Sequence, residues 1–349
     1  MCAAAALTAL AAAAAAQSKP LPRLKTPELD EIGRAGVPIR DSVLKTSRIR
    51  ALSANGYWGG QYRTAAGESV TIYASNTYPV DPALGQRWAD FLASLLHTSE
   101  ISTVRVFIST PAEISSVCGT EAYACYSPQG DVIYAPGEDP SPELSAEAVI
   151  THEYGHHVAA NRSNAPWDAL DWGPKRWASA MQVCARTKQS QLAPGAEDPV
   201  RYQLNPGEGW AETYRVLNQR RLGLTESPWG IVTNSLYPTA AALTAAAQDV
   251  TNPWQADTSS ARTGSVTRTA RTRTYTFATP LDGTLKVTLR SSAGLRASLD
   301  VFATRTRAAH AAGPGTLSRS TTVCGTRTYR VRVSELSGKG SFRLAVAEP

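Results

Sequence analysis

The sequence predicts an α+β domain followed by a small all-β sandwich domain, and three observations lead to this prediction. The chain has 349 residues, more than one hydrophobic core usually accommodates, so two domains of unequal size are expected. Up to about residue 252, segments with helical spacing of apolar residues occur between segments that alternate like strands. Beyond that point helix signals end, and period-2 segments rich in Thr, Ser and Arg follow one another between turns that contain Gly.

An apolar leader opens the sequence. Residues 1–16 are almost all Ala and Leu and end in Ala14-Ala15-Ala16, which is typical of the apolar core and cleavage site of a signal peptide. The alternative is a low-complexity Ala-rich leader, because the usual basic start is missing. We expect a signal peptide here and therefore a secreted, extracellular protein. No later run approaches the roughly 18 apolar residues that span a bilayer, so no membrane span is expected.

Residues 17–60 are predicted to be an N-terminal extension, and residues 61–252 the α+β domain. Two of its helices begin with strong capping signals, since Asp81 precedes Pro82 and Ser141 precedes Pro142. The second of these helices is expected to end near Ala160. The expected strands of this domain are 68–75, 103–109 and 130–135, and the expected helices are 82–97, 141–160, 175–187, 206–221 and 238–249.

A polar linker is expected at residues 253–270 and the β-sandwich at residues 271–349. Residues 260–349 carry 15 Lys and Arg against 4 Asp and Glu, a balance of +11, whereas the remainder carries 20 against 25, a balance of −5. A basic appendage favours an anionic partner such as a cell-envelope surface. The simpler interpretation, which we prefer at this point, is that these cations lie on the solvent-facing sides of strands. The expected strands are 273–278, 284–290, 298–303, 328–334 and 341–347.

Four cysteines remain once Cys2 in the leader is set aside. Cys118 and Cys125 bracket a short segment, so a local disulfide between them is expected. This pairing would leave Cys184 to join Cys324 and link the two domains, although four thiols allow three pairings. A cysteine metal site is disfavoured because none of the four stands in a close Cys-x-x-Cys pair.

The segment His152-Glu153-Tyr154-Gly155-His156 predicts a zinc site. Two histidines four apart project from one face of a helix, where their neutral rings bind one Zn²⁺, and Glu153 lies beside them to accept a proton from a water that the metal activates. Gly155 supports this interpretation, because glycine within a helix costs about 1 kcal/mol and something must therefore approach closely there.

A catalytic zinc site needs a third protein ligand and one open position. Because His97, His157 and His310 are the remaining histidines, a carboxylate is favoured as this ligand. Glu208 and Glu212 are four apart on a predicted helix, so one of them can bind the metal while the other accepts the ring N–H of a ligand histidine. The alternative is an ordinary solvated pair of glutamates.

With these residues in place, the chain resembles the gluzincin zinc peptidases, in which HExxH is followed by a helix that bears a glutamate ligand. The resemblance, over about residues 130–220, implies a zincin-like α+β catalytic domain, with Glu208 as the third metal ligand and Glu212 as the acid that orients a ligand histidine. It also implies a tyrosine that stabilises the oxyanion, here Tyr202, for which packing under a loop is an equal alternative. His157 could serve instead of Tyr202, could support a metal ligand as Glu212 does, or could merely hydrogen-bond at the helix surface.

Two further features belong to this resemblance. Gly130–Ala135 stands where such peptidases present an edge strand, which an extended substrate could join by β-augmentation. Metzincin peptidases are disfavoured, because Ala159 and Arg162 occupy the positions of their glycine and third histidine. The C-terminal part, with the run Val323–Val333, is similar to the pre-peptidase C-terminal domains of secreted bacterial proteases, which implies secretion or surface binding and no chemistry of its own.

The sequence therefore predicts a secreted, monomeric zinc endopeptidase that acts on a peptide or protein substrate and binds no nucleic acid. Two alternatives stay open. The same zinc chemistry could cut peptides of the cell envelope. The chain could instead be a secreted binding or surface-attachment protein whose zinc site is structural or vestigial, although Glu153 argues against a purely structural site.

Overall fold

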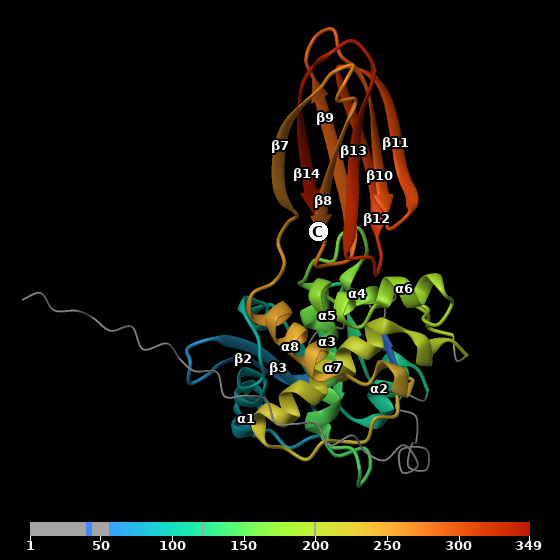
Figure 1. Cartoon of the computed structure of the whole chain (residues 1–349). Helices are drawn as coiled ribbons and strands as arrows, with labels where there is room; N and C mark the ends of the chain where they lie inside the picture. The colour runs from blue at the N-terminus through green and yellow to red at the C-terminus, as the bar shows by residue number, and fades with distance from the viewer. Residues whose placement is uncertain (1–39, 44–55, 121, 199) are drawn as a thin grey trace, which may run out of the picture.

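A six-stranded mixed sheet organises the first domain (Figure 1). The structure is a computed structural model of the chain and describes residues 40–43, 56–120, 122–198 and 200–349; the predicted signal peptide and most of the N-terminal extension lie outside them. The strand order is β1-β5-β6-β4-β3-β2, in which β3, β4 and β6 are parallel and β5 runs antiparallel to β6. The strands are β1 (Arg40–Val43), β2 (Tyr57–Arg63), β3 (Ser69–Ser75), β4 (Arg105–Ser109), β5 (Ala122–Ser127) and β6 (Val132–Pro136).

The three predicted strands of this sheet are confirmed, with two corrections at its edges. β2 pairs with β3, so residues 57–60 belong to the domain and not to an N-terminal extension. Gly130–Ala135, which corresponds to β6, is not an edge strand, because β5 lies between it and β1. β1, which comes from the N-terminal extension, pairs in parallel with β5 and forms the edge.

Capping and local backbone conformation correct two predicted helices. α3 begins at Ala146, because Ser145 accepts from the amide of Ala148 at 3.1 Å, whereas Ser141 lies in a preceding turn. The predicted helix 175–187 is two helices, since Gln182 between them has a left-handed backbone with φ 55°. The helices are α1 (Pro82–Ser94), α2 (Pro111–Cys118), α3 (Ala146–Ala160), α4 (Ala169–Trp172), α5 (Lys175–Ala180), α6 (Val183–Lys188), α7 (Pro206–Leu222) and α8 (Ala240–Thr251), with 3₁₀ turns η1 (Ser99–Ser102), η2 (Tyr202–Leu204) and η3 (Asn234–Leu236).

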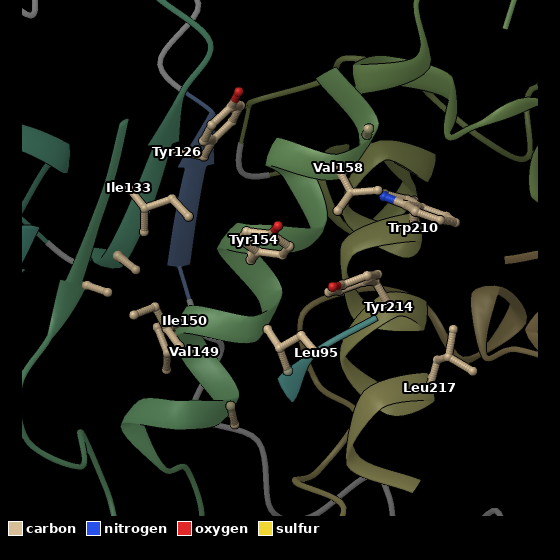
Figure 2. Close-up of a cluster of buried hydrophobic side chains, with 14 of the residues drawn as sticks. Leu95, Tyr126, Ile133, Val149, Ile150, Tyr154, Val158, Trp210, Tyr214 and Leu217 are labelled. Atoms are coloured by element: carbon tan, nitrogen blue, oxygen red, sulfur yellow. The ribbon is translucent and has the colours of Figure 1, made fainter. Parts of the chain in front are cut away.

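Helix α3 lies between the sheet and α7, and its side chains pack in both directions (Figure 2). Ile150 and Tyr154 are fully buried on α3, as are Ile133 of the sheet and Trp210 of α7. Burial on nearly every side explains why α3 has no amphipathic stripe. The consequence for function is that the two predicted histidine ligands project from a helix held rigidly in the core.

The C-terminal domain is a β-sandwich of two antiparallel four-stranded sheets, ordered β11-β10-β13-β8 and β12-β9-β14-β7. The sandwich begins at Thr258, so the predicted linker 253–270 is wrong over most of its length. The first strand of the sandwich was not predicted, because only Val266 among its residues is buried and the hydrophobic signal is weak. The strands are β7 (Thr258–Val266), β8 (Thr272–Ala278), β9 (Gly283–Ser291), β10 (Arg296–Ala303), β11 (Thr306–Pro314), β12 (Thr316–Val323), β13 (Thr328–Ser337) and β14 (Gly340–Glu348).

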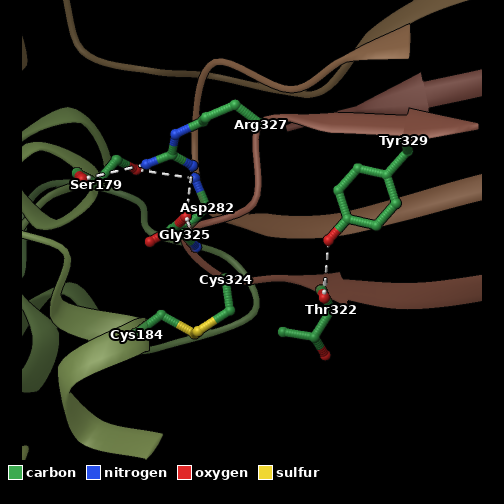
Figure 3. Close-up of a disulfide and its surroundings, with 8 residues drawn as sticks. All are labelled: Ser179, Cys184, Asp282, Thr322, Cys324, Gly325, Arg327 and Tyr329. Atoms are coloured by element: carbon green, nitrogen blue, oxygen red, sulfur yellow. Dashed lines mark hydrogen bonds and ion pairs between the residues drawn. A yellow bond between two sulfur atoms is a disulfide. The ribbon is translucent and has the colours of Figure 1, made fainter. Parts of the chain in front are cut away.

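Both predicted disulfides are present, and Cys184–Cys324, whose cysteines are farther apart in the sequence, joins the two domains (Figure 3). Beside Cys184–Cys324, the Asp282 carboxylate accepts from Nη1 of Arg327 at 2.6 Å, and Nη2 of Arg327 donates to the Ser179 carbonyl at 3.3 Å. The sandwich is thus tied to the α+β domain covalently and by hydrogen bonds. Disulfides of this kind are typical of proteins outside the reducing cytoplasm. None of the described helices has the length and apolar character to cross a membrane.

Replacing both cysteines of the interdomain disulfide by serine is expected to lower the free energy of unfolding by about 2–4 kcal/mol, because this bridge closes a long segment of the unfolded chain. The two cysteines are 140 residues apart in sequence. Calorimetry should then resolve two transitions, whereas the two domains of the wild type are expected to unfold in a closely coupled way. The matched control is the Cys118→Ser/Cys125→Ser variant, which removes a bridge over only 7 residues and leaves the domains linked. A smaller loss of unfolding free energy for the Cys184/Cys324 variant than for the control would contradict this prediction.

Candidate metal centre

The site is built where α3 crosses α7. The two backbones approach so closely at Gly155 that a Cβ there would lie 2.9 Å from Cα of Ala211. Nε1 of Trp210 also donates to the Gly155 carbonyl at 2.8 Å. The expectation that Gly155 permits a close approach is therefore confirmed, and this contact fixes the distance between the helices that carry the predicted ligands.

Substitution of this glycine tests the close contact. Gly155→Ala is expected to lower the free energy of unfolding by about 1–2 kcal/mol, because overpacking against backbone atoms outweighs the better helix propensity of alanine. Gly209→Ala in α7 is the matched control, since the nearest neighbours of its new Cβ are side-chain atoms of Leu236, the closest being Cδ1 at 3.0 Å, and not backbone atoms. Denaturant midpoints measure both effects. Equal midpoints for the two variants would show that the helices have room to separate.

Three ligand atoms converge between the helices. Nε2 of His152 lies 3.2 Å from Nε2 of His156, and Oε2 of Glu208 lies 3.3 Å from the first and 3.1 Å from the second. These residues form the group of potential metal ligands found among the described residues. All three side chains are at most 3% exposed.

The spacing of these atoms fits a zinc ion. Ligand atoms about 2.0 Å from a tetrahedral Zn²⁺ lie about 3.3 Å from one another, close to the distances found here. A single proton on one ring nitrogen satisfies only one contact of the triangle, whereas one cation at its centre satisfies all three. A buried carboxylate such as Glu208 also needs a positive partner. The donor set of two imidazoles and one carboxylate is one that zinc accepts.

Glu212 sets the orientation of the His152 ring. Its Oε1 accepts from Nδ1 of His152 at 2.9 Å, which leaves the lone pair of Nε2 directed at the triangle. This is the arrangement that metal-bound histidines commonly have, with a carboxylate behind the ring. The structure thus brings together His152, His156, Glu208 and Glu212 as the sequence predicted.

Arg215 completes this arrangement and was not predicted. Its Nε donates to Oε1 of Glu212 at 2.7 Å and its Nη2 to Oε2 at 2.6 Å, and both side chains are fully buried. Burial alone would raise the pKa of the Glu212 carboxyl, but the Arg215 charge and its hydrogen bonds lower that pKa to about 2. Glu212 therefore stays ionised and can accept from His152. The i, i+3 spacing of Glu212 and Arg215 is the sequence signal that could have identified the pair.

Glu153 lies on the same helix as His152 and His156, whereas Tyr202 lies in a separate turn. Glu153 is 1% exposed and stands three residues before His156 on α3, which places the two side chains on neighbouring positions of the helix surface. Tyr202 lies in the 3₁₀ turn η2, just before α7, and packs half-buried against the domain core. Its role in stabilising an oxyanion stays a prediction.

His157 does not support the metal centre, contrary to one of the predictions. Its Nε2 lies 2.9 Å from the carbonyl oxygen of Glu100, and its Nδ1 lies 3.4 Å from the Tyr126 hydroxyl and 3.5 Å from Oδ1 of Asp131. The reason is helix geometry, because a residue next to His156 is rotated by about 100° and faces the sheet. His157 therefore anchors α3 to the sheet.

Comparison with known proteins adds partial structural similarities only. No protein-family model matches the chain, and no curated protein matches it in sequence. The pre-peptidase C-terminal domain of a collagenase from Bacillus anthracis is similar at 18% identity, with 26% of this chain and 89% of that chain covered and a TM-score of 0.23. The Aeromonas hydrophila lysozyme inhibitor PliG is similar at 19% identity, with 26% and 86% covered and a TM-score of 0.21.

A carbohydrate-binding module, the C-terminal CBM6 of LamC from Zobellia galactanivorans, is similar at 16% identity. The matched region covers 25% of this chain and 100% of that module, with a TM-score of 0.16. Because TM-scores of this size carry no argument, the description of the C-terminal domain as a β-sandwich rests on its own two sheets.

Proposed function

We propose that the protein is a secreted zinc-dependent endopeptidase of gluzincin type with a zincin-like catalytic domain. The observation that carries the proposal is the triangle of His152 Nε2, His156 Nε2 and Glu208 Oε2, with sides of 3.1–3.3 Å. The two histidines lie on α3, the helix that also bears Glu153, and Glu208 lies on α7. The described residues supply three ligands, and a catalytic zinc needs three with a fourth position left for water or substrate.

Each residue has a defined task in this proposal. His152, His156 and Glu208 would hold the zinc ion, which would supply polarisation of the scissile carbonyl and a lowered pKa of water. Glu153 accepts the proton of the attacking water and delivers a proton to the leaving amine. Glu212, held ionised by Arg215, keeps the His152 ring in its productive tautomer. Tyr202 stabilises the oxyanion.

The substrate in this proposal is a peptide or protein outside the cell, and the enzyme acts as a monomer. The basic C-terminal domain binds an anionic cell-envelope surface and so keeps the catalytic domain near its substrate. Peptides of the envelope itself are an alternative substrate for the same chemistry. A binding protein with a structural zinc is the alternative in a different class, and it predicts bound zinc without cleavage.

Metal analysis and cleavage assays on the purified full-length chain test the proposal. We expect one zinc per chain by elemental analysis, cleavage of a quenched fluorescent peptide library, loss of cleavage with chelator and recovery when zinc is restored. A parallel assay on cell-wall peptides decides between the two substrate classes. Zinc binding without cleavage of either class would establish the binding-protein alternative, and protein that binds no zinc would overturn the proposal.

A further inference from the structure

The sandwich presents two broad sheet faces to solvent, because it stands on the α+β domain at one end of its strands (Figure 1). One of these faces consists of the outward positions of β12, β9, β14 and β7, and we call it the arginine face. Lys286, Arg290 and Arg343 are its three cations, and all are exposed. Pairing across the sheet confirms the common face, since Thr288 of β9 hydrogen-bonds Ser318 of β12 at 3.0 Å.

Two of the cations stand directly opposite each other. Arg290 of β9 pairs in register with Arg343 of β14, with Thr316 and Thr263 as their outer neighbours on β12 and β7. Like charges directly opposite on a sheet destabilise it. Two guanidinium groups on neighbouring strands form a site that one carboxylate can bridge through charge-assisted hydrogen bonds.

None of the described side chains on the arginine face compensates this charge. Its other outward positions hold Ser, Thr and Ala, and the carboxylate of its strands, Glu348, has the opposite orientation, in phase with the buried Val346. On the opposite sheet, by contrast, the buried carboxylate of Asp300 lies within ion-pair distance of Arg307, His310 and Arg332. The described ion pairs of the domain lie away from the arginine face: Arg271–Glu335, Arg307–Asp300, His310–Asp300, Arg332–Asp300 and Arg327–Asp282.

We propose that the arginine face binds a carboxylate-bearing polysaccharide laid flat across its strands. Arg290 and Arg343 hold one carboxylate, and Lys286, four residues or about 13 Å along β9, attracts another farther along the polymer. The short hydroxyl side chains between them exchange hydrogen bonds with sugar hydroxyls. Among the described residues, the outward positions of this face carry no aromatic ring on which nucleic-acid bases could stack and no large apolar side chain that could hold a peptide.

This inference rests on the proposed surface-binding role of the C-terminal domain and is independent of the zinc chemistry. Calorimetric titration of the full-length chain with polygalacturonate tests it, with fully methyl-esterified polygalacturonate as the uncharged ligand. Arg290→Thr/Arg343→Thr is expected to weaken binding roughly 10-fold or more. The matched control is Arg273→Thr/Arg330→Thr on the other sheet, which removes the same charge and should stay within about twofold of wild type.

Melting temperature separates binding from folding. Because the substitution relieves repulsion between like charges, the Arg290/Arg343 variant should melt at the wild-type temperature or above it. The inference would be overturned if both double variants lost equal affinity for polygalacturonate, or if the wild type bound the esterified polymer equally well. Equally tight binding of single-stranded DNA would also overturn it and leave a role for net charge alone. A wild-type chain that binds no anionic polymer would also overturn the surface-binding role, while the zinc proposal would stand on its own assay.

Discussion

Glu153→Gln is expected to reduce kcat for peptide cleavage by roughly 100- to 10,000-fold, the range that a positioned general base contributes. The amide keeps the size of the side chain and its place on α3, but it cannot accept a proton. His152, His156 and Glu208 are unchanged, so one zinc per chain should remain bound. Steady-state kinetics on the peptide found by the library screen, together with elemental analysis of the same sample, measure both quantities.

A variant on the same helix controls for charge and folding. Glu147→Gln removes one carboxylate six residues earlier, at a partly exposed position in the first turn of α3. Its activity and zinc content should equal those of the wild type. Full activity of Glu153→Gln would show that another group takes the proton, and loss of zinc in that variant would mean that the substitution acts through the metal site.

The proposed metal ligands were predictable because helix geometry alone relates the members of each pair. His156 lies four positions after His152, and Glu212 lies four positions after Glu208. Each pair therefore shares a helix face whatever the rest of the fold is. Their convergence depends on the close crossing of α3 and α7 at Gly155, and only the unusual glycine pointed to it. Arg215 was missed because its role depends on being buried with Glu212, and one sequence gives no measure of that burial.

Several errors in the fold come from strands and helix ends that carry little hydrophobic signal. β7 has one buried residue, and β12 likewise has only Val323. Such strands join the sheet through backbone hydrogen bonds, which any sequence can form. The start of α3 was misplaced because the Ser141-Pro142 signal competes with Ser145. The choice depends on a tertiary contact, in which Oδ1 of Asp139 accepts from the amide of Ala146 at 2.9 Å.

The second large effect is expected from Arg215→Met, which leaves the buried Glu212 carboxylate without its cation. Breaking a buried ion pair in this way costs about 3–5 kcal/mol of stability. The zinc affinity should also fall, by about 10- to 100-fold, because Glu212 no longer holds His152 firmly in place. Chemical denaturation measures the first effect, and competition with a fluorescent chelator measures the second.

Two further variants separate stability from metal binding. Arg162 forms another buried ion pair, with Glu100 at 3.0 Å, so Arg162→Met should destabilise the domain to a similar degree and leave the zinc affinity unchanged. Adding Glu212→Gln to Arg215→Met removes the unpaired charge but retains an oxygen that accepts from His152, so part of the lost stability should return. If Arg162→Met weakened zinc binding as much as Arg215→Met, the effect would come from general loosening of the core, and Arg215 would have no specific part in orienting the metal ligand.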